Sequence, residues 1–562
     1  MKKNVLTRAM ALALSALTIA PFAACGGGEN VGAGGEAIDA SKTQLTLFHY
    51  FAGFGDEWIV ELGDNFEEAV KDISFEEGKV GVQVHHRGEM RDFTAGQVKS
   101  SQYDVLFLEG PDDFLNIMAE NAVEPLDSIM DVANEKDGGQ SISSKLTQQQ
   151  KDFYYYNGHY YGIPHYAGHY GLIYNVDLFD AKGFYLAETP DEDTGNILIS
   201  ASNPTKGVGP DGIRGTSDDG LPRTYDEFFA LCEEINQRGV DPVCFPGQYV
   251  HHHTSMFLDY LISNNEGAEQ MNLNYTFNGT ATDLVVFNAD GSIKKDANGN
   301  IVTESKEIKP ENAYELGRQK GRYYGFDFMQ RLLGNTNYYN EEDGRDNTSM
   351  SHTENQQNFL ENESLGKKPS AMLMDGTWWE IEADDVFSYM AESDEKYSKE
   401  NRRFAWLPLP HPTEEDAQAA AEGKKKSVFM DYLNAVACVK AGLSDGVKKA
   451  ALALMQYAYT DEALANFTYT TGATIGVDYL DAVDRSKLNY YVTSLIDYIE
   501  KSDKVYQVSG TTLFSANQKK FIPSYVYGSG SYVAIHNGIW DGNVSAEDYF
   551  KGHQAAWKGL VW

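Results

Sequence analysis

An alternation of strand-like and helix-like segments constrains the fold of this chain more than any other feature. Residues 45–49 alternate between apolar and polar side chains, and after a glycine-containing turn an apolar stripe that includes Trp58 recurs at helical spacing. Residues 80–84 predict a second strand. Residues 104–108 are almost uniformly apolar, as expected of a strand covered on both faces, and Pro111 opens the next helix. This order predicts an α/β fold with parallel strands.

Later segments continue the pattern. Thr224 and Glu227 have the spacing of a capping box at the start of an amphipathic helix. Residues 434–439 predict another strand, and residues 447–459 form an alanine-rich helix. Residues 274–310 lie between the capping box and the strand predicted at residues 434–439. They contain Asp-Gly and Asn-Gly pairs, which predict a hairpin excursion on a loop.

The N-terminus has the pattern of an export signal. Basic residues precede an apolar run at residues 9–20, which is too short for a permanent membrane anchor, and small residues then lead to Cys25. The segment resembles a bacterial lipoprotein signal, in which residues 1–24 are removed and the cysteine is lipidated. Residues 25–40 would then be the lipidated cysteine with a glycine-rich tether. An ordinary secretory signal with another cleavage point is the alternative; in both cases the mature protein works outside the cytoplasm.

Length and charge limit the classes of partner. A chain of 562 residues exceeds the size at which one core keeps growing, so at least two lobes are expected. The net charge of −37 repels phosphate backbones and anionic lipid headgroups, which argues against nucleic acid and against binding to a membrane surface. It suits a neutral ligand or metal ions. We expect a monomer attached to the membrane only through its lipid.

Cysteine and tyrosine usage add two further indications. Besides Cys25, the chain contains Cys232, Cys244 and Cys438, an odd number at wide spacing that matches neither a disulfide framework nor a zinc site. Cys232 and Cys244 have the option of pairing, but buried free thiols are the better interpretation. The 35 tyrosines combine a flat apolar ring with a hydroxyl, which suits sugar rings; a large, well-packed core explains them equally well.

Several blocks, in this order, resemble the maltose-binding-like extracellular carbohydrate-binding proteins of ABC importers, the family 1 solute-binding proteins. The blocks are residues 104–111, 160–179, 223–229, 371–379, 404–410 and 434–476. The resemblance implies a two-lobed periplasmic-binding-protein fold of type II, with hinge strands and a ligand cleft between the lobes. Lobe one would comprise residues 41–165 and 432–475. Lobe two would comprise residues 166–431 and 476–562, with insertions at 187–222 and 274–310.

The same resemblance implies a function. The protein would be the non-enzymatic, lipid-anchored binding subunit of an ABC importer, with an oligosaccharide as ligand and no catalytic cofactor. Hinge closure over the sugar would let the permease distinguish a loaded protein from an empty one. The alternative from another class is a secreted carbohydrate-active hydrolase that uses a carboxylate pair such as Glu109 and Asp375. A surface adhesin that binds polymer without lobe closure is a third option.

Candidate ligand-binding residues of lobe one follow its strands. Asp56, Glu57 and Trp58 come after the first strand, at the carboxyl end where open α/β sheets place ligands. The carboxylates would accept hydrogen bonds from sugar hydroxyls and the indole would stack, unless Trp58 belongs to the core. Glu109 and Asp112 occupy the equivalent position after the strand at residues 104–108; otherwise they cap the following helix.

The other candidates come from the lobe crossing and from lobe two. His165, Tyr166 and His169 flank the first proposed crossing and would face the cleft. By resemblance, Asp375, Trp378 and Trp379 form a cleft-facing platform, with one indole on the sugar and the other inside. The sequence does not decide which. Neighbouring His251, His252 and His253 are interpreted as a solvated surface run.

Two further motifs concern other chemistry. Aspartates interleaved with glycines allow short carboxylates and carbonyls to converge on a hard cation, which predicts a structural calcium site. Its ligands would be Asp191, Asp193, Asp211, Asp218 and Asp219. Residues 442–446 match a hydrolase nucleophile elbow by letter, but we interpret Ser444 as the N-cap of the helix that follows.

Overall fold

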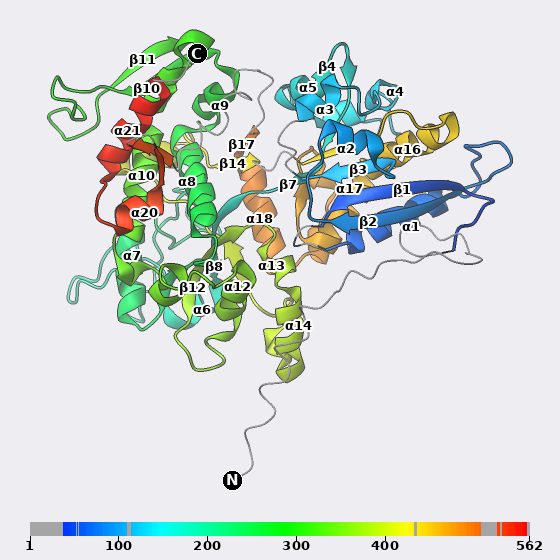
Figure 1. Ribbon diagram of the computed structural model, residues 1–562. Helices are drawn as coiled ribbons and strands as arrows, with labels where there is room; N and C mark the ends of the chain where they lie inside the picture. The colour runs from blue at the N-terminus through cyan, green and yellow to red at the C-terminus, as the bar shows by residue number, and fades with distance from the viewer. Residues whose placement is uncertain are drawn as a thin grey trace.

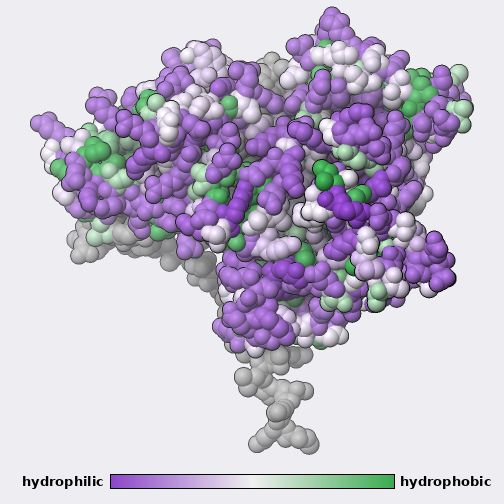
Figure 2. Space-filling view, turned by 180° about the vertical axis from the view of Figure 1, so that it is seen from behind, coloured by the Kyte–Doolittle hydropathy of each residue, from purple (hydrophilic) through white to green (hydrophobic). Residues whose placement is uncertain are grey.

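The computed structural model describes residues 37–51, 53, 55–109, 114–431, 435–506, 525–528 and 531–558. The export segment, Cys25 and Asp112 therefore lie outside the described residues. Within the described residues, no helix has both the length and the apolar character needed to cross a membrane. The surface seen in Figure 2 is largely hydrophilic, with hydrophobic residues in small scattered patches.

The first sheet has five strands in the order β2-β1-β3-β15-β6. They are β1 (Thr43–Tyr50), β2 (Val82–Glu89), β3 (Val105–Leu108), β6 (Ile163–Pro164) and β15 (Val436–Val439). Strand β1 is parallel to β2 and β3, whereas β15 is antiparallel to both of its neighbours. The sheet is thus mixed rather than purely parallel as predicted. Helices α1 (Glu57–Ala69), α16 (Asp445–Ala458) and α17 (Asp461–Thr471) lie beside it (Figure 1).

The second sheet has the order β13-β8-β12-β9. Its strands are β8 (Tyr170–Asn175), β9 (Asp241–Cys244), β12 (Ser370–Gly376) and β13 (Phe404–Trp406). Every residue of β8 and β12 is buried, which explains their continuous apolar character. Helices α7 (Tyr225–Gln237), α8 (Val250–Glu266) and α10 (Lys320–Leu333) pack around this sheet in the left-hand lobe of Figure 1.

Short strand pairs lie between the two bodies. β7 (Tyr166–Ala167) pairs with β16 (Thr474–Ile475), and β14 (Val428–Asp431) pairs with β17 (Asp503–Tyr506). Figure 1 shows β7, β14 and β17 in the middle of the molecule. The chain leaves the first sheet after β6 and returns to it in β15, so the two bodies are joined by several connections. The exact lobe boundaries stay a prediction.

The remaining elements are short or peripheral. The other α-helices are α2 (Ala95–Ser100), α3 (Phe114–Ala119), α4 (Asp127–Met130), α5 (Gln148–Tyr154), α6 (Val176–Lys182), α9 (Ala268–Thr276), α11 (Glu341–Gly344), α12 (His352–Glu361), α13 (Trp379–Glu382), α14 (Asp384–Ser393), α15 (Glu414–Ala421), α18 (Tyr490–Lys501), α20 (Ile535–Trp540) and α21 (Ala546–Lys558). The other strands are β4 (Tyr155–Tyr156), β5 (His159–Tyr160), β10 (Gly279–Val285), β11 (Thr303–Ile308), β18 (Tyr525–Gly528) and β19 (Ser531–Ala534). The 3₁₀ turns are η1 (Glu135–Asp137), η2 (Ile142–Lys145), η3 (Pro310–Arg318), η4 (Thr336–Tyr338), η5 (Glu395–Tyr397), η6 (Leu480–Ala482) and η7 (Arg485–Lys487).

The predicted hairpin excursion is confirmed. β10 and β11 form an antiparallel pair, and the chain between them makes two further turns. Gly291 and Gly299 adopt φ values of 83° and 88° at these turns, a backbone region that favours glycine. The Asp-Gly and Asn-Gly pairs therefore mark the turns correctly.

Two predicted helix caps differ in detail. The Thr224 hydroxyl accepts a hydrogen bond from Glu227 N at 3.2 Å, but the Glu227 carboxylate accepts from Arg223 N at 2.6 Å, one residue before the predicted partner. Ser444 is the N-cap of α16, although its hydroxyl makes no capping hydrogen bond. The three cysteines of the described chain are free and buried, which confirms the free-thiol interpretation.

Candidate functional site

The two bodies face each other through a set of residues that we call the interlobe junction. On the side of the first sheet it comprises Gly53, Asp92 and Glu109. On the side of the second sheet it comprises His352, Gln356, Asp375, Trp378 and Glu382. A Cβ atom placed on Gly53 would lie 2.7 Å from Glu382 Oε1, so the turn after β1 approaches α13 closely. Asp92 and Glu382 both act electrostatically on Glu109, which joins the two sides.

Glu109 is the central carboxylate on the first side. It follows β3 directly, and its Oε2 atom is buried without a hydrogen-bond partner. Burial raises the pKa of Glu109 to about 7, and the negative charges of Asp92 and Glu382 add to the shift. Burial, Glu109 and Asp92 likewise raise the pKa of Tyr50 at the end of β1. Because the pKa of Glu109 is close to neutral pH, a charge placed beside its carboxyl group strongly changes the fraction that is ionised.

On the side of the second sheet, the amide group of Gln356 connects the two acidic side chains of the junction. Gln356, on α12, donates through Nε2 to Asp375 Oδ2 at 3.0 Å and to Glu382 Oε2 at 2.6 Å. Asp375, near the end of β12, is 1% exposed and also accepts from Gly376 N at 2.7 Å. Burial and Glu382 raise the pKa of Asp375 to about 7. His352 Nε2 lies 3.3 Å from Glu382 Oε1, and this contact raises the pKa of His352.

The two adjacent tryptophans have different surroundings. Trp379 is fully buried against Phe359, Phe404 and Tyr491, so it packs inside. Trp378 is only partly buried. Its ring centroid lies 6.3 Å from that of Tyr166. Of the two indoles, Trp378 is therefore the one that has a surface available for a ligand.

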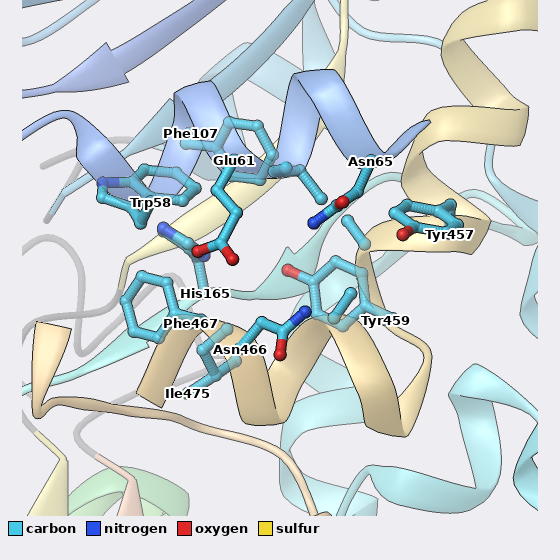
Figure 3. A pocket seen from close by; sticks show the side chains of 13 residues that line it. Trp58, Glu61, Asn65, Phe107, His165, Tyr457, Tyr459, Asn466, Phe467 and Ile475 are labelled. Atoms are coloured by element: carbon cyan, nitrogen blue, oxygen red, sulfur yellow. The ribbon is translucent and has the colours of Figure 1, made fainter. Parts of the chain in front are cut away.

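Trp58 lies in the interior of the first lobe. It is 5% exposed, and its indole meets the rings of Phe107 and Phe467 edge-on at 5.3 Å each. Together with His165 it lines the small cavity shown in Figure 3, toward which the side chains of Glu61, Asn65 and Asn466 point. The cavity volume is about 30 Å³, which leaves room for water but not for a sugar ring. The apolar stripe of α1 thus places Trp58 in the core.

The lobe-crossing residues are also packed. Tyr166 and His169 are 2% and 1% exposed. His169 Nδ1 lies 3.0 Å from Met430 N, and its ring stacks on Phe429 with centroids 4.4 Å apart. His253, interpreted as a surface residue, is 5% exposed and meets Tyr170 edge-on, because that face of α8 turns toward β8.

The structure therefore divides the predicted ligand-binding residues into three groups. Glu109, Asp375 and Trp378 belong to the interlobe junction. Asp56 and Glu57 are exposed where α1 begins. The interior holds Trp58, His165, Tyr166, His169 and Trp379. No ring face of these interior residues is open to a sugar in this conformation, and ligand contact by the other groups stays a prediction.

Sequence reasoning missed His352, Gln356 and Glu382. His352 and Gln356 are four residues apart on α12, and Glu382 follows Trp378 by one helical turn. Helical spacing places residues separated by four positions on one face, so both pairs carried a usable local signal. What the sequence did not reveal is that these two faces lie beside the same strand, β12.

The candidate calcium ligands do not converge. Asp191 uses Oδ1 to accept from Thr194 N at 2.9 Å, in a turn of its own. In the later loop, Asp218 Oδ2 accepts from Asp211 N at 3.0 Å, and Asp219 Oδ2 accepts from Gly215 N at 2.8 Å. Across the described residues, no three histidine, cysteine or acidic side chains form a group able to hold a metal ion. The calcium site stays a prediction.

Comparison with known proteins agrees with this architecture. Residues 57–315 match the family model of the bacterial extracellular solute-binding proteins. This part of the chain is therefore similar to that family. It is a family of binding proteins rather than of enzymes, and its members act outside the cytoplasm. No curated protein sequence matches the chain.

Solved structures show the fold over almost the whole chain. A chitin oligosaccharide binding protein matches with a TM-score of 0.52 and 14% identity, covering 92% of this chain and 99% of its own. The GacH receptor of Streptomyces glaucescens GLA.O, solved unliganded and with acarbose, matches with a TM-score of 0.51 and 14% identity, covering 92% and 98%. The apo form of RafE from Streptococcus pneumoniae gives a TM-score of 0.53 and 13% identity, covering 93% and 99%. The predicted two-lobed periplasmic-binding-protein fold is thereby confirmed.

Proposed function

We propose that this protein captures a carbohydrate, an oligosaccharide, between its two lobes and delivers it to the membrane subunits of an ABC importer. The observation that carries the proposal is the composition of the interlobe junction. There, the partly exposed indole of Trp378 lies one helical turn from the Glu382 carboxylate, and Glu109 faces Glu382 from the other lobe. A flat aromatic face beside charged acceptors suits the C–H face and the hydroxyl edge of a sugar.

Two further observations support this function. The family consists of extracellular solute-binding proteins, and two of the similar structures carry names that refer to a chitin oligosaccharide and to acarbose. Hinge movement at the connections through β7, β14 and β15 would let the lobes close over a ligand and so change the outer surface. A permease that reads this surface would admit only the loaded protein.

Attachment to the membrane belongs to the same proposal. Cys25 would carry the lipid at the end of the export segment, and residues 26–35 would act as a flexible tether. The folded lobes would then work as a monomer next to the permease. Mass spectrometry of the mature protein tests this point, because an acylated Cys25 at the N-terminus gives a mass that a simple secretory cleavage does not.

Isothermal titration calorimetry against a panel of oligosaccharides tests the binding function. We expect one sugar class to bind with roughly micromolar affinity, as two or three aromatic platforms together with several charge-assisted hydrogen bonds provide. Trp378→Ala should weaken that binding about tenfold, since stacking on an indole contributes about 1–2 kcal/mol. Tyr389→Ala, which removes an aromatic ring that is 66% exposed on α14, is the matched control and should bind normally.

The same samples test the enzymatic alternative. Incubation with each sugar should leave it intact. New reducing ends that disappear in Glu109→Gln or Asp375→Asn would support the hydrolase with a carboxylate pair and contradict the binding function. A protein that binds none of the sugars would also contradict the proposal.

A further inference from the structure

The interlobe junction is rich in hydrogen-bond acceptors that have no donor. Glu109 Oε2 is buried and has no hydrogen-bond partner. Gln356 is 1% exposed; its Nε2 is used by Asp375 and Glu382, whereas its Oε1 is buried and has no partner. Exchanging the positions of Oε1 and Nε2 in Gln356 would not satisfy the side chain, because the amide oxygen would then face the carboxylates of Asp375 and Glu382. The junction thus needs a guest that donates hydrogen bonds.

In the described part of the chain, positive charge is scarce around the junction carboxylates of Glu109, Asp375 and Glu382. The carboxylate of Glu382 acts electrostatically on those of Glu109 and Asp375. The facing cationic group is His352, at 3.3 Å from Glu382. In the described part of the chain, no ion pair joins Glu109 or Asp375 to a lysine or arginine.

Glu89, in the first lobe, is a carboxylate whose negative charge is compensated by nearby cations. Glu89, at the end of β2, accepts from Arg87 Nε at 2.6 Å and lies 3.4 Å from Arg91 Nε. The guanidinium of Arg91 in turn lies 4.2 Å from the centre of the Phe93 ring. Among the described residues, Glu89 therefore has two guanidinium partners, whereas no ion pair is formed by Glu109.

The acceptors without donors and the scarcity of positive charge together indicate the chemistry of the ligand. A neutral sugar hydroxyl donates one hydrogen bond and brings no charge, so carboxylates taken out of water on closure stay uncompensated. An ammonium group donates three hydrogen bonds and neutralises the site through charge-assisted contacts. Hydroxyls elsewhere on the same molecule would still serve Gln356 Oε1.

We propose that the preferred ligand is a carbohydrate bearing a protonated amine, bound with the ammonium group between Glu109 of one lobe and Glu382 of the other. The inference rests on the proposed carbohydrate-binding function and narrows its ligand class. Gln356 and Asp375 act as positioning residues, because Gln356 donates to the Glu382 carboxylate and Asp375 accepts from the same Gln356 amide. The cation replaces the mutual repulsion of the two lobes by a shared attraction, so it favours the closed arrangement.

A matched set of sugars tests the inference. Calorimetry just below neutral pH would compare β-1,4-linked oligomers of glucose, N-acetylglucosamine and glucosamine of equal length, which differ only at C2. The expected result is that the amine form binds at least about tenfold more tightly than the other two, since a charge-assisted contact at a partly buried site contributes more than a neutral one. Added salt should reduce this preference, because ions screen the charge–charge attraction.

Variants connect the preference to the named residues. Glu109→Gln and Glu382→Gln should each reduce the preference for the amine form at least about fivefold while changing the affinity for the hydroxyl form little. Glu342→Gln, at an exposed position of α11, removes the same charge elsewhere and should leave the preference intact. Circular dichroism melting would verify that each variant is folded.

The outcomes are distinguishable. If the hydroxyl or acetamide form binds as well as the amine form, the amine inference is overturned and carbohydrate binding stands. If calcium alone binds and Glu109→Gln abolishes that binding, the acidic set serves a metal ion and the inference is also overturned. If no oligosaccharide binds, both the inference and the proposed function fall.

Discussion

At the scale of single residues, Lys145 shows how the first lobe holds together. Its side chain is 2% exposed, and Nζ donates to Asp137 Oδ2 at 3.0 Å, to Asp461 Oδ1 at 2.6 Å and to the Tyr459 carbonyl at 2.9 Å. One buried ammonium thus joins η2 to the helices α16 and α17, which lie about 300 residues further along the chain.

Lys145→Met tests this arrangement. The substitution leaves Asp137 buried without its cation, so we expect a loss of about 3–5 kcal/mol in the free energy of unfolding. Urea denaturation measures the change. Lys71→Met is the matched control, because the Lys71–Glu68 pair is 59% and 73% exposed. Its removal should change stability by less than about 0.5 kcal/mol. Equal effects of the two substitutions would contradict the structural role.

Glu109 also predicts a pH dependence. Its pKa is about 7 in the folded protein and near 4.5 when unfolded, so the unfolded chain loses its proton first as pH rises. The stability associated with Glu109 is therefore present below pH 4.5 and is lost as pH rises toward 7.

Glu109→Gln should remove this loss. At pH 8 the variant should be more stable than the parent protein by about 2–3 kcal/mol, and at pH 4 the two should be nearly equal. Thermal melts across this range measure the difference, with Glu342→Gln as the control. A variant that is less stable at high pH would show that the Glu109 charge is compensated.

At the scale of elements, local rules predicted several of the helices and strands. The apolar stripe of α1, the cap at Thr224 and the hairpin glycines are signals carried by neighbouring residues. Pairing between distant strands has no such signal. The insertion of β15 between β3 and β6, and the meeting of α12 with α13 beside β12, depend on tertiary packing, so sequence reasoning missed Gln356 and Glu382.

The aspartate-rich loop is a second element with a prediction of its own. We propose that residues 209–220 bind calcium and reorganise their carboxylates to do so, since Asp211 and Asp218 are already adjacent. Adding a chelator should lower the melting temperature measurably, and Asp218→Asn should abolish that response. In the structure, the carboxylates of this loop accept hydrogen bonds from the backbone of the same loop. If chelator leaves the melting temperature unchanged, these carboxylates serve only to hold the loop and the calcium proposal is wrong.

At the scale of the whole molecule, the contact between Gly53 and Glu382 offers a way to fix the lobes. A Cβ on Gly53 would lie 3.0 Å from Glu382 Cβ, which is shorter than the roughly 3.5–4.5 Å found in disulfides, so a small separation of the two backbones brings a cysteine pair to bonding distance. The described cysteines, Cys232, Cys244 and Cys438, are buried and will not compete readily.

The double variant Gly53→Cys, Glu382→Cys should form a crosslink under oxidation. If a sugar enters only when the lobes separate, the oxidised protein should not bind it, and reduction should restore the binding measured for the single variant Glu382→Cys. Calorimetry before and after reduction makes the comparison. Unchanged binding in the crosslinked protein would mean that entry needs no separation of the lobes.

The position of β15 has a kinetic consequence. The strand lies between β3 and β6, yet it is synthesised only after the entire second sheet. The earlier part of the first sheet therefore lacks an inner strand for most of the time that the chain is being made, and its pairing is non-local, which slows folding. We expect this polypeptide to be exported in an unfolded state. The late synthesis of β15 favours that export, because the first sheet cannot be completed, and so cannot block the translocation channel, until most of the chain has been made.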